Sequence, residues 1–177
     1  MTRNLFLRMN RQNLRVLTML FFMIILLCLL IASGCTTDPS SLLSVHLIDV
    51  GQGDSQLIIT PQKSIVLIDA GDSLQGDRIV AYLTRLGINR IDHLILTHPH
   101  GDHIGGVPTI LNQLQVSKVY LPPLVHTSQL YEKILDHLTT HKIPTAIVGN
   151  TSLVLKEALL EVRILSAGQD FGNHLNN

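Results

Sequence analysis

One short segment, LTHPHGDHIGG at residues 96–106, constrains the fold and the chemistry of this chain more than any other. It places three of the nine histidines and one aspartate within six positions, namely His98, His100, Asp102 and His103. Imidazole nitrogens and carboxylate oxygens are ligands of zinc and related metals. His98 and His100 could share one ion, and the adjacent Asp102 and His103 could reach a second. The alternative is a solvated loop that is rich in histidine by chance, and four candidate ligands at this spacing argue against it.

The elements around this segment predict an α/β fold. An apolar run at 92–97 predicts a strand that leads directly into the segment, which we expect to be a loop at the carboxyl edge of the sheet. Apolar runs and amphipathic stretches predict further strands at 42–50, 56–60, 64–71, 118–122 and 145–149, a hairpin at 152–167, and helices at 76–87, 107–114 and 128–142. Strands that alternate with helices indicate an α/β class, and the early hairpin indicates a mixed sheet.

The first 35 residues have the organisation of a secretory signal. Four arginines precede residues 16–31, which are almost entirely apolar, and Ala32, Ser33 and Gly34 then lead to Cys35. A basic region, an apolar stretch and small residues before a cut site define such a signal, and the cysteine makes it resemble a bacterial lipobox. Cys35 would then be the first mature residue and would carry lipid. An uncleaved membrane anchor is the alternative, although the stretch is short for the ~20 residues of a spanning helix.

Both interpretations attach the chain to the cell membrane and place its domain on the extracytoplasmic side, because positively charged flanks stay inside. We therefore expect three parts: a lipoprotein signal or anchor at 1–35, a polar linker at 36–43 and a folded domain at 44–177. The domain would contain no disulfide of its own, since no cysteine follows Cys35. The sequence gives no sign of a protein partner.

The formal net charge of zero conceals a difference between the two ends of the chain. Four of the thirteen Lys and Arg precede the apolar stretch, so nine remain beyond residue 35 against all thirteen Asp and Glu, a balance of −4. An acidic domain is poorly suited to a broad footprint on a phosphate backbone. The charge is still compatible with a metal site that handles one phosphate at a time.

Three segments together resemble the metallo-β-lactamase superfamily. THPHGDHIGG at 97–106 is similar to the T-H-x-H-x-D-H-x-G-G motif of that superfamily, and DVGQGDS at 49–55 and LIDAG at 67–71 lie at the expected distances upstream. The D-V-G-Q-G-D-S form resembles the extracellular β-lactamase-like domain of ComEC-type competence proteins. The resemblance covers residues 44–177 and implies an αβ/βα sandwich with mixed sheets, of which this chain holds the N-terminal half and the start of the second.

The resemblance also implies roles for individual residues. His98 and His100 would bind a first zinc ion, and Asp102 and His103 a second, with Asp102 also counted as catalytic. Other divalent metals could replace zinc. Asp69 would orient a metal ligand through a hydrogen bond, and Asp54 would line the mouth of the same site; for both, the alternative is a simple turn-forming role.

The superfamily takes its remaining ligands from the second half of the fold, and the chain ends in NHLNN where that half should continue. His137 and His141 stand four apart on a predicted helix and could form a zinc pair, but we expect them on a solvated edge. Two functions therefore stay open. The chain is a metal-dependent hydrolase, such as a phosphodiesterase or nuclease acting on a small molecule or nucleic acid, or it is an inactive fragment or remnant that binds metal weakly.

Overall fold

The computed structural model describes residues 11–32, 42–124, 127–158 and 160–167. The chain divides into two compact units, Met1–Pro39 and Ser40–Asn177. In the first unit the structure describes one helix, α1 (Arg11–Ala32). Within the part of the chain that the structure describes, no helix is both long and apolar enough to cross a membrane. The proposed lipid-carrying residue, Cys35, lies outside the described residues.

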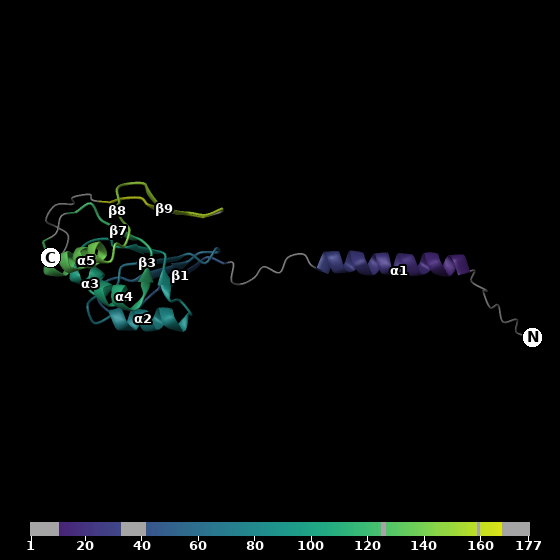
Figure 1. The fold of residues 1–177 in the computed structure, drawn as a ribbon, viewed down its shortest axis with the longest axis horizontal. Coiled ribbons are helices and arrows are strands. Elements are labelled where there is room, and N and C mark those ends of the chain that lie inside the picture. The colour runs from purple at the N-terminus through teal and green to yellow at the C-terminus, as the bar shows by residue number, and fades with distance from the viewer. Residues whose placement is uncertain (1–10, 33–41, 125–126, 159, 168–177) are drawn as a thin grey trace, which may run out of the picture. The chain divides into compact units, whose positions relative to one another are not determined.

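The second unit is built on a six-stranded mixed sheet (Figure 1). Its strands lie in the order β1, β2, β3, β5, β7, β8. The first three pair antiparallel as hairpins, and the pairs from β3 to β8 are parallel. The strands of this sheet are β1 (Ser44–Leu47), β2 (Gln56–Ile59), β3 (Ile65–Ile68), β5 (His93–Ile95), β7 (Val119–Leu121) and β8 (Thr145–Ile147). The predicted α/β class with a mixed sheet is therefore confirmed.

Four further strands form two small ribbons. They are β4 (Arg90–Ile91) with β6 (Gln115–Val116), which run parallel, and β9 (Ser152–Lys156) with β10 (Glu161–Ile164), which form an antiparallel hairpin. The hairpin falls inside the predicted 152–167. The two-residue strands were not expected, because hydrophobic periodicity cannot be recognised over so short a stretch.

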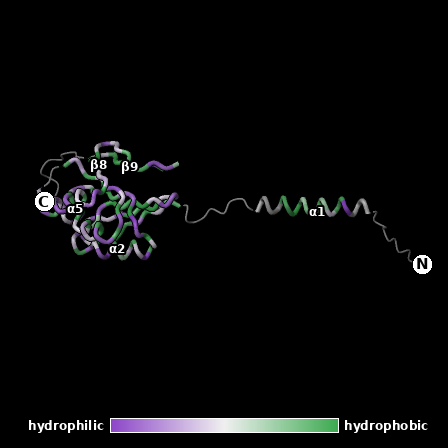
Figure 2. Tube along the Cα trace, viewed as in Figure 1, coloured by the Kyte–Doolittle hydropathy of each residue, from purple (hydrophilic) through white to green (hydrophobic). Residues whose placement is uncertain are grey.

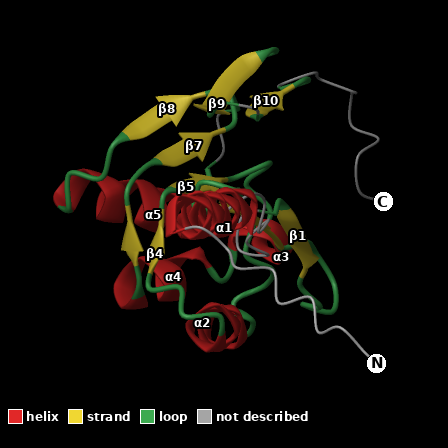
Figure 3. Cartoon of the chain, turned by 90° about the vertical axis from the view of Figure 1, so that its right-hand side faces the viewer, coloured by secondary structure: helices red, strands yellow, loops and turns green. Residues whose placement is uncertain are grey.

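Helices cover one face of the sheet and the β9–β10 hairpin covers the other (Figure 3). The helices are α2 (Gly76–Arg85), α3 (Gly101–Ile104), α4 (Val107–Gln113) and α5 (Gln129–Thr140). In Figure 2 both α2 and α5 carry hydrophobic and hydrophilic stretches, as expected of helices that bury one side. The one-turn helix α3 corrects the expectation that the whole 96–106 segment is a loop.

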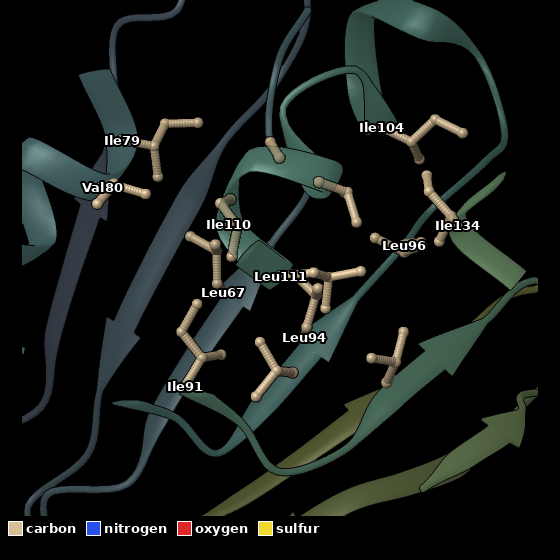
Figure 4. Close-up of a cluster of buried hydrophobic side chains, with 14 of the residues drawn as sticks. Leu67, Ile79, Val80, Ile91, Leu94, Leu96, Ile104, Ile110, Leu111 and Ile134 are labelled. Carbon is tan, nitrogen blue, oxygen red and sulfur yellow. The ribbon is translucent and has the colours of Figure 1, made fainter. Parts of the chain in front are cut away.

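The main core lies between the helices and the sheet. Figure 4 shows Leu67 and Leu94 from the sheet packed with Ile79 of α2, Ile110 of α4 and their neighbours. Because side chains alternate across a strand, the residues adjacent to the two leucines point to the other face. There Val66, Ile95, Tyr120, Val148 and Val154 form a second, smaller core beneath the hairpin. Burial on both faces explains why the central strands are nearly continuous apolar runs.

Candidate metal centre

The histidine segment leaves the sheet at the carboxyl end of β5. His98 lies in the connection that follows the strand, and His100 stands at the N-cap of α3 with an extended backbone, φ −83° and ψ 149°. Asp102 and His103 lie within α3 itself. The parallel part of the sheet therefore places all four predicted ligands at its carboxyl edge, where α/β folds carry their sites.

Three of these four residues form one group. Ligand atoms of His98, Asp102 and His103 lie within 4.8 Å of one another, the one such group of three or more among the residues that the structure describes. The ring centroids of His98 and His103 are 3.7 Å apart. His100 is not a member, although its ring lies 4.9 Å from that of His98. The expected division into His98 with His100 and Asp102 with His103 differs from this grouping; the ligand roles stay predictions.

Asp69 is a buried carboxylate that holds one member of the group through a hydrogen bond. It follows β3, its side chain is only 1% exposed, and its backbone has a positive φ of 55°. Its Oδ1 accepts a hydrogen bond from the Thr97 backbone N–H at 2.9 Å, and its Oδ2 accepts from the Thr97 hydroxyl and from Nδ1 of His103, the latter at 2.9 Å. Burial raises the pKa of Asp69 above its ordinary value, and these hydrogen bonds oppose the shift. The carboxylate thus has the hydrogen bonds that a buried charge needs.

These hydrogen bonds determine which nitrogen of each imidazole is available. An ionised Asp69 only accepts, so His103 must carry its proton on Nδ1 and leave Nε2 as a lone pair. The Thr97 hydroxyl donates to Asp69 and therefore accepts, at 3.1 Å, from Nδ1–H of His98. Nε2 of His98 is then also a lone pair. Partial burial, followed by repulsion from His103 and His100, lowers the pKa of His98 and favours this neutral, metal-binding form.

The loop at 51–55 closes one side of the group. Asp54 lies there with its side chain 62% exposed and its Oδ2 3.9 Å from Nδ1 of His103. Gly53 has a φ of 97°, and a Cβ at this position would lie 1.8 Å from the carbonyl oxygen of Asp102. A side chain cannot be accommodated, so the loop packs directly on the backbone of α3. The Gly71 N–H also donates to the Asp54 carbonyl at 2.9 Å, which ties the loop to the end of β3.

The glycine that follows α3 has a similar role. A Cβ at Gly105 would lie 2.4 Å from both the Ser73 nitrogen and the Gly101 carbonyl oxygen. This close approach lets the end of α3 pack against the turn that follows Asp69. Together with Gly53 it fixes the position of the helical turn that carries Asp102 and His103.

Sequence reasoning did not identify two residues that shape this group. Thr97 orients both Asp69 and His98, and Gly53 permits the contact with Asp102. Thr97 is part of the quoted motif, and its place between a buried strand and the first histidine was the available signal. Gly53 lies in the DVGQGDS segment, but its role was not visible because Asp102, which it contacts, is distant in the chain.

The other histidines that the structure describes lie outside the three-residue group. His46 and His93 make hydrogen bonds to the hydroxyls of Tyr82 and Tyr120, at 2.8 and 2.9 Å. His137 and His141 stack on α5, with ring centroids 4.0 Å apart. His126 and His174 fall outside the described residues.

The donor set suits a divalent metal ion. Two imidazole nitrogens and one carboxylate match the three protein ligands that catalytic zinc sites combine with a water. Ligand atoms in a tetrahedral zinc site lie roughly 3.3 Å apart, given bonds of ~2.0–2.1 Å, so separations of up to 4.8 Å require only a small closing movement. The structure therefore offers three ligands to one ion, where the sequence had suggested two ligands for each of two ions.

Comparison with known proteins identifies a family that matches this chain. A family model described as "Metallo-beta-lactamase superfamily" matches residues 48–141. ComE operon protein 3 of Bacillus subtilis is 34% identical over 109 residues, which cover 52% of this chain and 14% of that protein. Ribonuclease J of Mycoplasma genitalium is 34% identical over 87 residues, 41% of this chain and 14% of that protein.

The chain thus spans a small part of the length of these two relatives. Among solved structures, a subclass B3 metallo-β-lactamase from a soil metagenome library is similar, with 19% identity, a TM-score of 0.47, and coverage of 67% of this chain and 47% of that chain. The likeness to ComE operon protein 3 supports the resemblance to ComEC-type domains. A fold of this kind implies binding of a divalent metal ion, for which the His/Asp group offers candidate ligands. On the family model, which matches more than half of its residues, this chain belongs to the metallo-β-lactamase superfamily.

Proposed function

We propose that the chain is a zinc-dependent hydrolase of phosphodiesters, with nucleic acid as the substrate class. The observation that carries the proposal is the group of His98, Asp102 and His103, backed by the buried carboxylate of Asp69. Such a carboxylate–histidine–metal arrangement orients the ligand and raises its basicity. The superfamily includes hydrolases, so the fold and the site point to the same class of reaction.

Each residue of the group has a separate task in this proposal. His98 and His103 would hold the ion through Nε2, and Asp102 through a carboxylate oxygen. Thr97 and Asp69 hold the two imidazoles in the tautomer that leaves Nε2 free to bind. A bound zinc ion would supply Lewis acidity toward a phosphoryl oxygen and a water of lowered pKa.

One observation supports the phosphodiester class, and a second limits how such a substrate would be recognised. The relatives matched over this part of the chain include two proteins named ribonuclease J. The region beyond residue 35 is acidic, with nine Lys and Arg against thirteen Asp and Glu. Broad electrostatic binding along a nucleic acid is therefore disfavoured, and the proposal places recognition at the metal centre itself.

The test uses the full chain, loaded with Zn²⁺ or Mn²⁺, and three substrates: bis(p-nitrophenyl) phosphate, a single-stranded oligonucleotide and a chromogenic β-lactam. We expect metal-dependent cleavage of the phosphodiesters that His103→Ala abolishes, with His46→Asn as the control at a histidine outside the group. Cleavage of the β-lactam alone would overturn the phosphodiester assignment. Retention of phosphodiester cleavage in His103→Ala would overturn the site.

The second candidate is a metal-binding domain without hydrolytic activity. It is favoured by the ligand count, because the described residues bring together three ligands for one ion, whereas the resemblance implies two ions. Binding of one zinc ion per chain, lost in His103→Ala, without cleavage of any of the three substrates, would support this candidate over the first.

We also propose that the chain is a lipoprotein attached to the extracytoplasmic face of the cell membrane through Cys35. Support comes from the four N-terminal arginines, the apolar stretch at 16–31 and the small residues before the cysteine. Expression with a labelled fatty acid should give a labelled chain, and Cys35→Ser should abolish the label. Cys28→Ser is the matched control, because that cysteine lies within the apolar stretch. Equal labelling of the parent and Cys35→Ser would contradict lipidation at this residue.

A further inference from the structure

The two ends of the sheet strands carry different groups of residues. The candidate metal ligands lie at the carboxyl edge, where β5 leads into the histidine segment. The opposite edge, here called the amino edge, consists of the starts of β3, β5, β7 and β8, the ends of α2 and α5, and the β2–β3 and β9–β10 turns. The two turns meet where the Thr60 hydroxyl donates to Glu157 at 2.7 Å. The chain enters the sheet at the amino edge, because Ser44 at the start of β1 pairs with Ile59, which pairs with Ile65 at the start of β3.

The charged residues are divided unevenly between these two edges. Among the residues that the structure describes, the carboxyl edge and the first turn of α2 carry six aspartates and one arginine: Asp49, Asp54, Asp69, Asp72, Asp77, Asp102 and Arg78. The amino edge carries six basic and three acidic residues: Lys63, Arg85, Arg90, Lys118, Lys142, Lys156, Asp92, Glu157 and Glu161. The acidic balance of the region beyond residue 35 therefore conceals a basic amino edge.

Two of the three acidic residues of the amino edge pair with basic residues of the same edge. A side-chain nitrogen of Arg90 lies 2.8 Å from a carboxylate oxygen of Asp92, and that of Lys156 lies 3.2 Å from one of Glu161. Four further basic residues belong to this edge, and all but the second are exposed: Lys63, Lys118, Arg85 and Lys142. The amino edge thus presents a net positive charge to the solvent, which attracts anionic partners.

Exposed leucines lie among these cations. Leu42 and Leu43, which precede β1, are 62% and 48% exposed, and Leu86, the C-cap of α2, is 43% exposed. A pocket of about 530 Å³ is lined by Lys63, Leu86 and Arg90 together with other residues of the same edge. Binding at a membrane surface grows with the apolar area that is buried and with attraction to anionic lipids, so this combination fits a lipid surface.

The proposed attachment of the chain brings the amino edge close to a membrane. Cys35, the residue proposed to carry lipid, precedes Leu42 by seven positions. Even a fully extended segment of this length spans only about 25 Å. A tether this short raises the effective concentration of the membrane at the point where the chain enters the sheet, so a modest affinity of the amino edge for lipid is sufficient.

We propose that the amino edge docks on a surface of anionic phospholipid, with its leucines at the headgroup boundary and its cations on the lipid phosphates. The inference rests on the proposed membrane attachment. It turns the candidate metal centre away from the bilayer and toward substrates in solution. A nucleic acid fits the amino edge less well, because exposed leucines have no role on a phosphate backbone and the metal centre lies at the opposite edge.

A single introduced tryptophan can test the orientation, since the chain contains none. Leu86→Trp and the matched control Leu74→Trp place it after and before α2, a helix of 10 residues and about 15 Å, and Leu74 is 83% exposed. The protein, extracted from membranes of the expressing cells, is reconstituted with phosphatidylcholine alone or mixed with phosphatidylglycerol, each with acyl-brominated lipid as quencher. We expect several-fold stronger quenching of Leu86→Trp than of Leu74→Trp on the anionic vesicles, and a smaller difference on the neutral ones.

A second comparison removes cations in the Leu86→Trp background. Lys63→Asn and Lys142→Asn are suitable, because asparagine tolerates the positive φ of these positions, 67° and 53°. We expect the ratio of docked to undocked protein on anionic vesicles to fall roughly fivefold for each cation removed. Lys133→Gln, which removes an exposed cation from the middle of α5, is the control and should leave the ratio unchanged.

Flotation of the same vesicles separates docking from attachment. Flotation with both lipid compositions but equal quenching of Leu86→Trp and Leu74→Trp would overturn the docking surface and leave the attachment intact. Flotation with neither composition would overturn both. A change in Leu86→Trp emission on addition of a single-stranded oligonucleotide, with no response to anionic lipid, would show that the amino edge binds a nucleic acid instead.

Discussion

Two aspartates approach Nδ1 of His103, and their surroundings differ sharply. Oδ2 of Asp69 lies 2.9 Å from Nδ1 of His103, and the Asp69 side chain is 1% exposed. Oδ2 of Asp54 lies 3.9 Å from the same nitrogen, but that side chain is 62% exposed. Since Nδ1 has one proton and Asp69 accepts it, Asp54 interacts with His103 only through charge.

The difference shows that an aspartate close to a candidate metal ligand does not necessarily orient that ligand. Asp69 follows a central strand, and its backbone N–H donates to the Ile95 carbonyl at 2.9 Å, so the sheet fixes its position. Asp54 lies in the 51–55 loop, which contains two positive-φ glycines, Gly51 and Gly53. A group held by rigid elements and paired in the interior controls geometry, whereas a solvated group adds a screened charge.

The largest expected effect is at Asp69. Asp69→Asn keeps the size of the side chain and tolerates the positive φ, but its NH₂ group can donate a hydrogen bond to Nδ1 of His103. His103 would then carry its proton on Nε2, the atom that should bind the ion. We expect zinc affinity to fall by about 10–100-fold, measured by competition with a chromogenic chelator. Affinity within twofold of the parent would show that the tautomer of His103 is not controlled by Asp69.

The next effect concerns Gly53, the point at which the Asp54 loop contacts α3. Gly53→Ala would place a Cβ 1.8 Å from the Asp102 carbonyl oxygen, so the loop or the helix must move. We expect a loss of about 1–3 kcal/mol in the free energy of unfolding, measured with urea, together with weaker zinc binding. Gly51→Ala is a matched control, because Gly51 also has a positive φ, of 71°, but has nothing within 4 Å of its Cβ position. Equal losses in the two variants would show that backbone strain alone is responsible.

The structural elements that position these residues differ in how far they could be predicted from sequence. The strands β3 and β5, which lead to Asp69 and Thr97, were predicted within 64–71 and 92–97, because residues buried on both faces give unbroken apolar runs. The helical turn α3 was not, because Pro99 and Gly101 indicate a loop. Its conformation depends on packing by Gly53 and Gly105 against segments that are distant in sequence.

The candidate ligands could be named from their types and spacing, but not their grouping. Whether His98 lies next to His100 or next to His103 depends on the direction in which α3 turns after His100. The hydroxyl of Thr97 was missed for a related reason, since its partner Asp69 becomes a neighbour only when β3 and β5 are paired in register. The identity of the candidate ligands could thus be predicted from sequence, whereas their grouping and their hydrogen-bond partners could not.

A substitution at Thr97 tests whether hydrogen bonding also orients the second imidazole, that of His98. Thr97→Val keeps the shape of the side chain and removes the hydroxyl that links Asp69 to His98, while Asp69 keeps its bonds from the backbone and from His103. We expect zinc affinity to fall by a factor of about 5–10, corresponding to a hydrogen bond worth ~1 kcal/mol. Thr84→Val, which removes a hydroxyl bonded to the Val80 carbonyl within α2, is the control and should leave zinc affinity unchanged.

The smallest effect is expected at Asp54, and this prediction tests directly whether the two aspartates differ in their roles. Asp54→Asn removes a charge 3.9 Å from His103 but no hydrogen bond to that ring, and exposed ion pairs are worth only about 0–1 kcal/mol. Zinc affinity should therefore change by less than about fivefold, and 0.5 M salt should reduce the difference further because exposed charges are screened. The measurement is the same chelator competition at low and high salt, with Asp69→Asn in parallel. A salt-independent loss as large as that of Asp69→Asn would mean that Asp54 binds the ion directly. The two aspartates would then contribute equally to zinc affinity.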